Sequence, residues 1–136
     1  MKKIVWGVFI QLLIAIALAS CASMPREPIS EGNLSYLTGK WEGRRYVRQG
    51  TFRTEMEIYN DTLPLKGKLI FHEVKRKTGG TYTWEFMQGM IKDSNLYIKR
   101  GQNNIELSLH KGDGKMKLEG DLFVEGYEGT ITLYKK

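Results

Sequence analysis

The single cysteine of the chain, Cys21, carries the side chain best suited to covalent chemistry. It follows Leu18-Ala19-Ser20, an aliphatic residue and two small ones. Small side chains let the backbone enter a protease groove, and the thiol is the only strong nucleophile in this stretch. Because there is no second cysteine, a disulfide within the chain is excluded. The stretch is therefore suited to contact with a protease and to covalent chemistry at the sulfur of Cys21.

The first 20 residues have the layout of a signal peptide. Lys2-Lys3 forms a basic end, and an apolar run of 15 residues extends from Ile4 to Leu18. This run is shorter than the roughly 20 residues that a transmembrane helix needs, and Gln11 interrupts it. We therefore expect residues 1–20 to be a cleaved signal helix.

The segment Leu18-Ala19-Ser20-Cys21 resembles the lipobox of bacterial lipoproteins. The resemblance implies a diacylglyceryl group on the sulfur of Cys21, cleavage before this residue, and a further acyl chain such as palmitate on the new amino terminus. Ala22 stands where an aspartate would favour retention at the inner membrane, so the resemblance implies a lipid anchor in the outer membrane, on the periplasmic face. The alternative is an ordinary secretory signal with an incidental cysteine.

Residues 21–34 predict an extended, flexible tether after the lipidated cysteine. Pro25 and Pro28 obstruct a helix, and Ser and Gly residues surround them. A dozen extended residues would reach about 40 Å. Residues 35–136 would then form one folded domain, a length typical of a single hydrophobic core.

The charge balance argues against a nucleic-acid partner. Lys2 and Lys3 belong to the leader, so the rest of the chain carries 19 basic residues against 15 acidic ones. An excess of four positive charges is too small for a dedicated nucleic-acid footprint. The expected partners are instead the membrane, through the lipid anchor, and either a small hydrophobic ligand or an envelope protein.

Period-two alternation between turn signals predicts that the mature domain is all-β. Tyr82, Trp84 and Phe86, for example, alternate with polar residues. Short turns join antiparallel neighbours, and a meander with one apolar face avoids exposed edges by closing. The prediction is an antiparallel up-and-down barrel of about eight strands, at residues 39–49, 53–60, 66–75, 81–91, 95–100, 103–110, 115–124 and 127–135.

A Leu-x-Gly-x motif recurs around Gly39, Gly67 and Gly120, as expected where barrel strands bend or approach another backbone closely. The first copy, Leu37-Thr-Gly39-Lys-Trp41, resembles the first strand of calycins, the group that includes lipocalins, fatty-acid-binding proteins and avidins. This resemblance implies a small barrel with Trp41 closing one end. The chain lacks the arginine that covers this tryptophan from the last strand in lipocalins.

Four aromatic residues are the candidates for a barrel plug or a ligand cavity: Trp41, Tyr82, Trp84 and Phe86. An eight-stranded barrel has an interior just wide enough for side chains or one small ligand. Core filling is the preferred interpretation for Tyr82, Trp84 and Phe86, with a cavity lining as the alternative.

Other chemically capable residues give weaker signals. His72 and His110 lie on separate predicted strands, and a metal site would need carboxylates as further ligands, so no metal and no cofactor are predicted. No nucleophile elbow, catalytic cysteine or phosphate loop is present, and we expect no enzyme activity. Basic residues flank the first hairpin and a later turn: Arg44, Arg45, Arg48, Arg53 and Lys75-Arg76-Lys77. The preferred interpretation is that they form a solvated face, and the alternatives are contacts with anionic lipid headgroups or with polysaccharide.

These features predict an envelope lipoprotein whose lipocalin-like barrel binds a small apolar ligand. The alternative is an assembly or interaction module that uses the outer surface of a barrel with a filled core. The two differ in the interior, because a carrier requires a cavity of a few hundred Å³.

Overall fold

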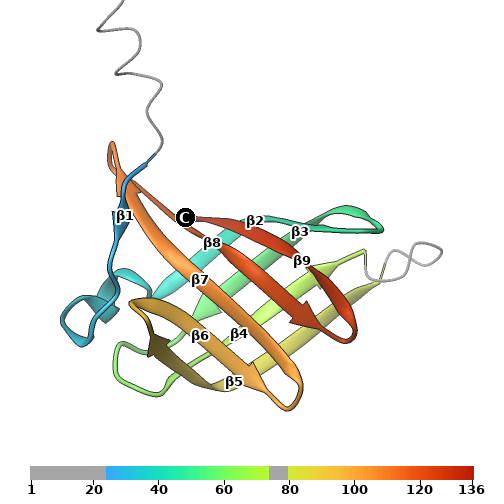
Figure 1. Ribbon diagram of the computed structural model, residues 1–136, viewed down its shortest axis with the longest axis horizontal. Helices are drawn as coiled ribbons and strands as arrows, with labels where there is room; N and C mark the ends of the chain where they lie inside the picture. Colours follow the sequence, from blue (N-terminus) through green and yellow to red (C-terminus); the bar gives the residue numbers. More distant parts are fainter. Residues whose placement is uncertain (1–23, 74–79) are drawn as a thin grey trace, which may run out of the picture.

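The computed structural model of the protein describes residues 24–73 and 80–136, which form a β-barrel (Figure 1). The signal peptide with Ser20, the lipidation residue Cys21 and the basic turn Lys75-Arg76-Lys77 lie outside the described residues. Within the described ranges, no helix has the length and apolar character needed to cross a bilayer.

Eight long strands, β2 to β9, build the barrel wall, and a short strand β1 and a 3-10 helix η1 precede them. β1 spans Arg26–Glu27 and η1 spans Glu31–Tyr36. The wall strands are β2 Gly39–Val47, β3 Gly50–Ile58, β4 Leu65–His72, β5 Thr81–Lys92, β6 Asn95–Arg100, β7 Asn103–Gly112, β8 Lys115–Val124 and β9 Tyr127–Lys135. The prediction of an all-β fold with about eight antiparallel strands is confirmed.

Each wall strand pairs with its neighbour in sequence, and pairing between β2 and β9 closes the sheet. The closing register runs from Trp41 opposite Lys135 to Val47 opposite Gly129. Two-residue turns such as Asp113-Gly114 and Glu125-Gly126 join the later strands, and all four residues have positive φ, as hairpins of this kind require. The observed strand bounds lie within three residues of those predicted.

The segment predicted as a free tether differs in the structure. β1 pairs with β7, with Arg26 opposite His110, and Ile29 is only 2% exposed. Its amide donates a hydrogen bond to the carbonyl oxygen of Ser94. The chain packs on the barrel from Met24 onward because Ile29, Leu34 and Leu37 supply apolar surface that fits over one end of it.

Two of the repeated glycines allow one strand to lie against another backbone. A Cβ atom at Gly67 would come 2.1 Å from the carbonyl oxygen of Glu57, and one at Gly120 would come 1.9 Å from that of Glu106. Real Cβ atoms do not approach oxygen this closely, so only glycine fits without moving the neighbouring strand. The predicted role of the motif at these two positions is confirmed.

We expect Gly120→Ala to lower the free energy of unfolding by about 3 kcal/mol, the upper end for overpacking, because a backbone oxygen cannot move aside as a side chain can. Urea denaturation of the chain lacking residues 1–20 measures the change. Gly32→Ala is the matched control, since its Cβ would meet only the Ser30 hydroxyl, at 3.7 Å. Equal stability of the two variants would contradict this account of the glycine.

Candidate functional site

One end of the barrel is closed by η1 and the residues after it. Trp41 is 1% exposed, and its indole Nε1–H donates a hydrogen bond of 2.8 Å to the carbonyl oxygen of Leu37. Lys135 covers the other side: its Nζ lies 5.8 Å from the Trp41 ring centre and donates to the Tyr36 carbonyl at 2.7 Å. Trp41 therefore plugs this end, and Lys135 on the last strand contacts its ring.

The aromatic residues of β5 divide between core and cavity. Trp84 and Phe86 are fully buried beneath the open end and fill the interior, with ring centres 6.5 Å apart. Tyr82, further along toward the open end, is 37% exposed and lies 6.4 Å from the ring of Phe71. Core filling thus describes Trp84 and Phe86, whereas Tyr82 lines a cavity.

This cavity has a volume of about 240 Å³ and opens at the end of the barrel opposite η1. Its lining is mostly apolar, and four polar side chains contribute as well: Arg45, Gln49, Glu73 and Glu125. The apolar and aromatic side chains come from β2, β3, β4, β5, β8 and the start of β9: Val47, Phe52, Phe71, Tyr82, Leu122, Val124 and Tyr127. Its concave shape, apolar lining and few polar groups are those of small-molecule pockets, and its volume is just below the roughly 300 Å³ at which such pockets usually begin.

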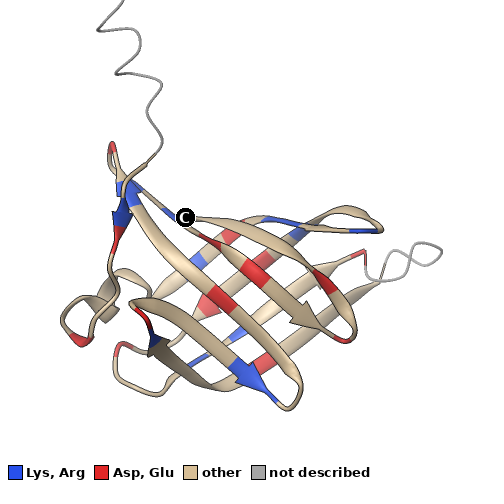
Figure 2. Cartoon of the chain, in the orientation of Figure 1, with Lys and Arg blue, Asp and Glu red and all other residues tan. Residues whose placement is uncertain are grey.

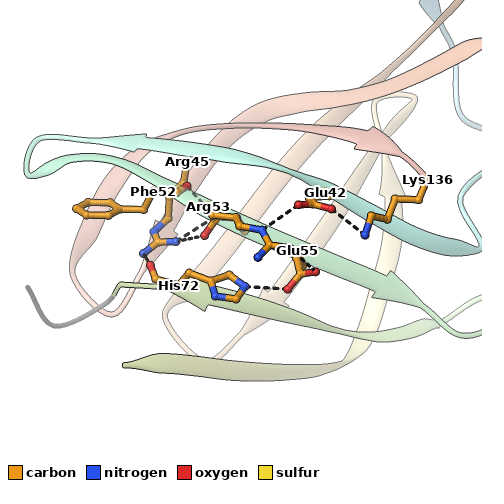
Figure 3. A network of polar contacts seen from close by, with 8 residues as sticks. Glu42, Arg45, Phe52, Arg53, Glu55, His72 and Lys136 are labelled. Atoms are coloured by element: carbon orange, nitrogen blue, oxygen red, sulfur yellow. Dashed lines mark hydrogen bonds and ion pairs between the residues drawn. The ribbon is translucent and has the colours of Figure 1, made fainter. Parts of the chain in front are cut away.

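Arg45 is the buried polar residue of the cavity, with 6% of its surface exposed. On β2 it shares the inward face with Trp41, four residues earlier. Its Nη1 donates to the carbonyl oxygen of Arg53 at 2.9 Å and to the hydroxyl of Thr54 at 3.0 Å, and its Nη2 donates to the carbonyl oxygen of His72 at 2.5 Å (Figure 3). These bonds fasten β2 to the open ends of β3 and β4.

The guanidinium of Arg45 also lies between two aromatic rings, 4.9 Å from the centre of Phe52 and 5.3 Å from that of Phe71. Burial lowers the pKa of Arg45, while the Glu73 carboxylate nearby acts in the opposite direction. An arginine nevertheless stays protonated in proteins. No carboxylate among the described residues lies within ion-pair distance of it, so Glu73 acts on the buried charge only from a greater distance.

The rest of the predicted basic group around the first hairpin faces outward. Arg44 is exposed, and Arg53 binds Glu42 at 2.9 Å and Glu55 at 3.4 Å on the outer surface (Figure 3). Hydrogen bonds from Lys136 and Arg53 lower the pKa of Glu42. These side chains form a solvated face, and sequence reasoning missed that Arg45 differs from them.

The two histidines lie in separate polar networks. His72 Nε2 is 2.8 Å from a carboxylate oxygen of Glu55, whereas His110 contacts Ser108 at 3.0 Å and the carbonyl oxygen of Met24 at 3.1 Å. Among the described residues, no three histidine, cysteine, aspartate or glutamate side chains gather where they could hold a metal ion.

No family model matches the chain, and neither the curated proteins nor the solved structures contain a match to it. The cavity and Arg45 are therefore interpreted from their own geometry.

Replacing Arg45 with methionine should lower the free energy of unfolding by about 2 kcal/mol, because one buried and two partly buried acceptors lose their donor. Urea denaturation monitored by tryptophan fluorescence measures this loss. The matched control is Arg44→Met on the outward face of the same strand, where a change within about 0.5 kcal/mol is expected. If both variants lost the same stability, the hydrogen bonds of Arg45 would contribute nothing.

Proposed function

We propose that this protein is a lipid-anchored binding protein of the bacterial envelope, which holds a small amphipathic ligand in the open end of its barrel. The ligand has an apolar body and one anionic group. The observation that carries this proposal is the buried charge of Arg45 at an apolar cavity, with no ion-pair partner among the described residues.

Buried charges in proteins are usually paired, because an isolated charge loses its hydration without compensation. The two rings beside Arg45 and its three acceptors compensate part of this cost. The bonds to described residues use three of the five N–H donors of the guanidinium. The two remaining N–H groups suit a carboxylate or another planar anion.

The rim of the cavity limits the ligand to one anionic group. Glu73 and Glu125 are exposed there, and Glu125 exchanges hydrogen bonds of 3.1 and 2.9 Å with the side chain of Asn103. Their charges are screened by water and salt, whereas the charge of buried Arg45 is screened much less. A second anion held at the rim would be repelled, so the outer end of the ligand is expected to be neutral.

The ligand proposal predicts that octanoate binds about ten-fold more tightly than octanol, since a hydrogen bond to a charged group contributes about 1.5 kcal/mol or more. Isothermal titration calorimetry with the chain lacking residues 1–20 measures both affinities. Arg45→Gln should remove the preference for octanoate while octanol still binds.

A second variant tests the cavity without changing Arg45, so its result does not depend on whether the Arg45 variant folds. Val124 lines the cavity and is 5% exposed, so Val124→Trp should occupy the space and abolish binding of both probes. If the wild-type chain bound neither octanoate nor octanol, or if Arg45→Gln kept the preference, the ligand proposal would be wrong.

The anchor proposal rests on the resemblance of Leu18-Ala19-Ser20-Cys21 to a lipobox. Two or more acyl chains give stable membrane attachment, whereas one is marginal. Cys21→Ser should therefore block lipidation and release the protein from the membrane fraction, as measured by fractionation and immunoblotting. Normal processing and unchanged membrane association of this variant would contradict the anchor.

A second candidate function is an interaction module, and the open edge of β5 favours it. β5 pairs with β6 only over Gly89–Lys92, so among the described strands Thr81–Gln88 pair with β4 alone. Arg100 covers part of this edge by donating a 3.1 Å hydrogen bond to the Glu85 carbonyl. An unpaired strand edge can accept an extended segment from another protein. Failure of both probes to bind would favour this candidate.

A further inference from the structure

We propose that the closed end of the barrel lies directly on the membrane, with Arg26, Lys111 and Lys115 against anionic lipid headgroups, so that the cavity opens away from the bilayer. This inference depends on the lipid anchor proposed above. It adds a membrane-contact surface and an orientation that the anchor alone does not supply.

The length of chain between the anchor and the barrel is the first argument. Met24 is already held at the barrel. Its carbonyl oxygen lies 3.1 Å from His110 Nδ1. Its side chain lies 3.6 Å from the position that a Cβ atom of Gly112 would take. The next carbonyl, of Pro25, accepts a 3.1 Å bond from the Lys111 amide. Cys21 lies three positions before Met24, a distance that an extended chain spans over at most about 11 Å.

Such a short connection cannot hold the domain clear of the lipid surface, as a tether of a dozen residues would. The part of the barrel next to Met24 must lie at the level of the headgroups. That part is the β7–β8 hairpin, with its turn at Asp113-Gly114. Figure 1 shows β1 beside the upper end of β7 in this hairpin, and the C-terminus near the same end of the barrel.

Charge at this end supports an anionic lipid partner. Arg26, Lys111 and Lys115 are exposed, and no described carboxylate lies within ion-pair distance of them. Figure 2 shows basic segments side by side on β1 and the adjoining end of β7, with acidic segments at the hairpin tip and on β1 directly below the basic one. Asp113 in this turn and Glu27 beside Arg26 are the acidic residues next to these three cations, which leaves an excess of one positive charge around the point where the described chain begins.

The side chains of Lys111 and Arg26 both contact residues at the closed end of the barrel. The Nζ of Lys111 lies 4.3 Å from the ring centre of Tyr36, the last residue of η1. Arg26 donates to the Asp93 carbonyl at 3.0 Å and to the Asn95 side chain at 2.8 Å, in the β5–β6 turn at the same end. The cations are therefore fixed to the closed end and do not reach the cavity.

The cavity lies at the other end of the strands. β7 and β8 each have ten residues, which extend about 33 Å, or about 25 Å along the axis of a tilted barrel. The β8–β9 turn at Glu125-Gly126, which borders the cavity, is thus held well outside the headgroup layer. A ligand would enter from the aqueous side and not directly from the membrane that holds the anchor.

The test compares two matched turn positions in the lipidated full chain. Asp113 and Glu125 are both exposed, have φ values of 51° and 52°, and precede a glycine with positive φ. D113C and E125C are each labelled with a fluorophore, since a lipidated Cys21 offers no free thiol. The proteins are reconstituted into vesicles of phosphatidylethanolamine and phosphatidylglycerol that contain headgroup-nitroxide lipid, and quenching is measured.

We expect quenching at position 113 to exceed that at position 125 by at least about three-fold, given the separation of the two turns along the strands. Reversing the charge in K111E/K115E should reduce the quenching at position 113. Equal quenching at both positions, or stronger quenching at 125, would overturn the orientation, and no effect of K111E/K115E would overturn the headgroup contact. Failure of the proteins to float with the vesicles would instead contradict the anchor, so the two proposals fail in different ways.

Discussion

Pairing between β2 and β9 is the constraint on which the rest of the structure depends. It joins the first and last wall strands, so the sheet has no free edge along this line and encloses an interior. Closure places Arg45 of β2 and Leu122 of β8 at the same cavity although they are far apart in sequence. It also brings Lys135 over Trp41, which completes the plug at the other end. The two ends of the barrel differ because of this one pairing: one is sealed by η1 and Trp41, and the other keeps a space.

The sequence predicted the wall strands well because their signal is local. Alternation of apolar and polar residues, together with turn residues that tolerate positive φ, defines a strand without knowledge of its partner. The packing of residues 24–37 could not be found in this way, since a two-residue strand and a six-residue 3-10 helix have no periodicity to detect. Pro25 and Pro28 were correct evidence against an α-helix but did not exclude an ordered segment. Ile29, Leu34 and Leu37 were the available signal.

Arg45 shows what the sequence could and could not reveal about the site. In the sequence, Arg45 cannot be distinguished from the solvated cations Arg44, Arg48 and Arg53 by residue type alone. Counting along the strand from Trp41 places it on the inward face, because residues four apart in a strand point to the same side. This parity could have singled it out. Its three acceptors come from β3 and β4, and the cavity is bordered by β8 and β9, so neither could be inferred from the local pattern.

The position of β9 between β2 and β8 has a consequence for how the chain reaches its native state. Until these last residues are available, the edges of β2 and β8 stay unpaired and the apolar interior is open to water. Contacts that join distant parts of a chain form slowly, because the intervening segment must first lose conformational freedom. The barrel is therefore most vulnerable to aggregation and proteolysis just before its final strand docks, and a chaperone that shields strand edges would have its greatest effect at that stage.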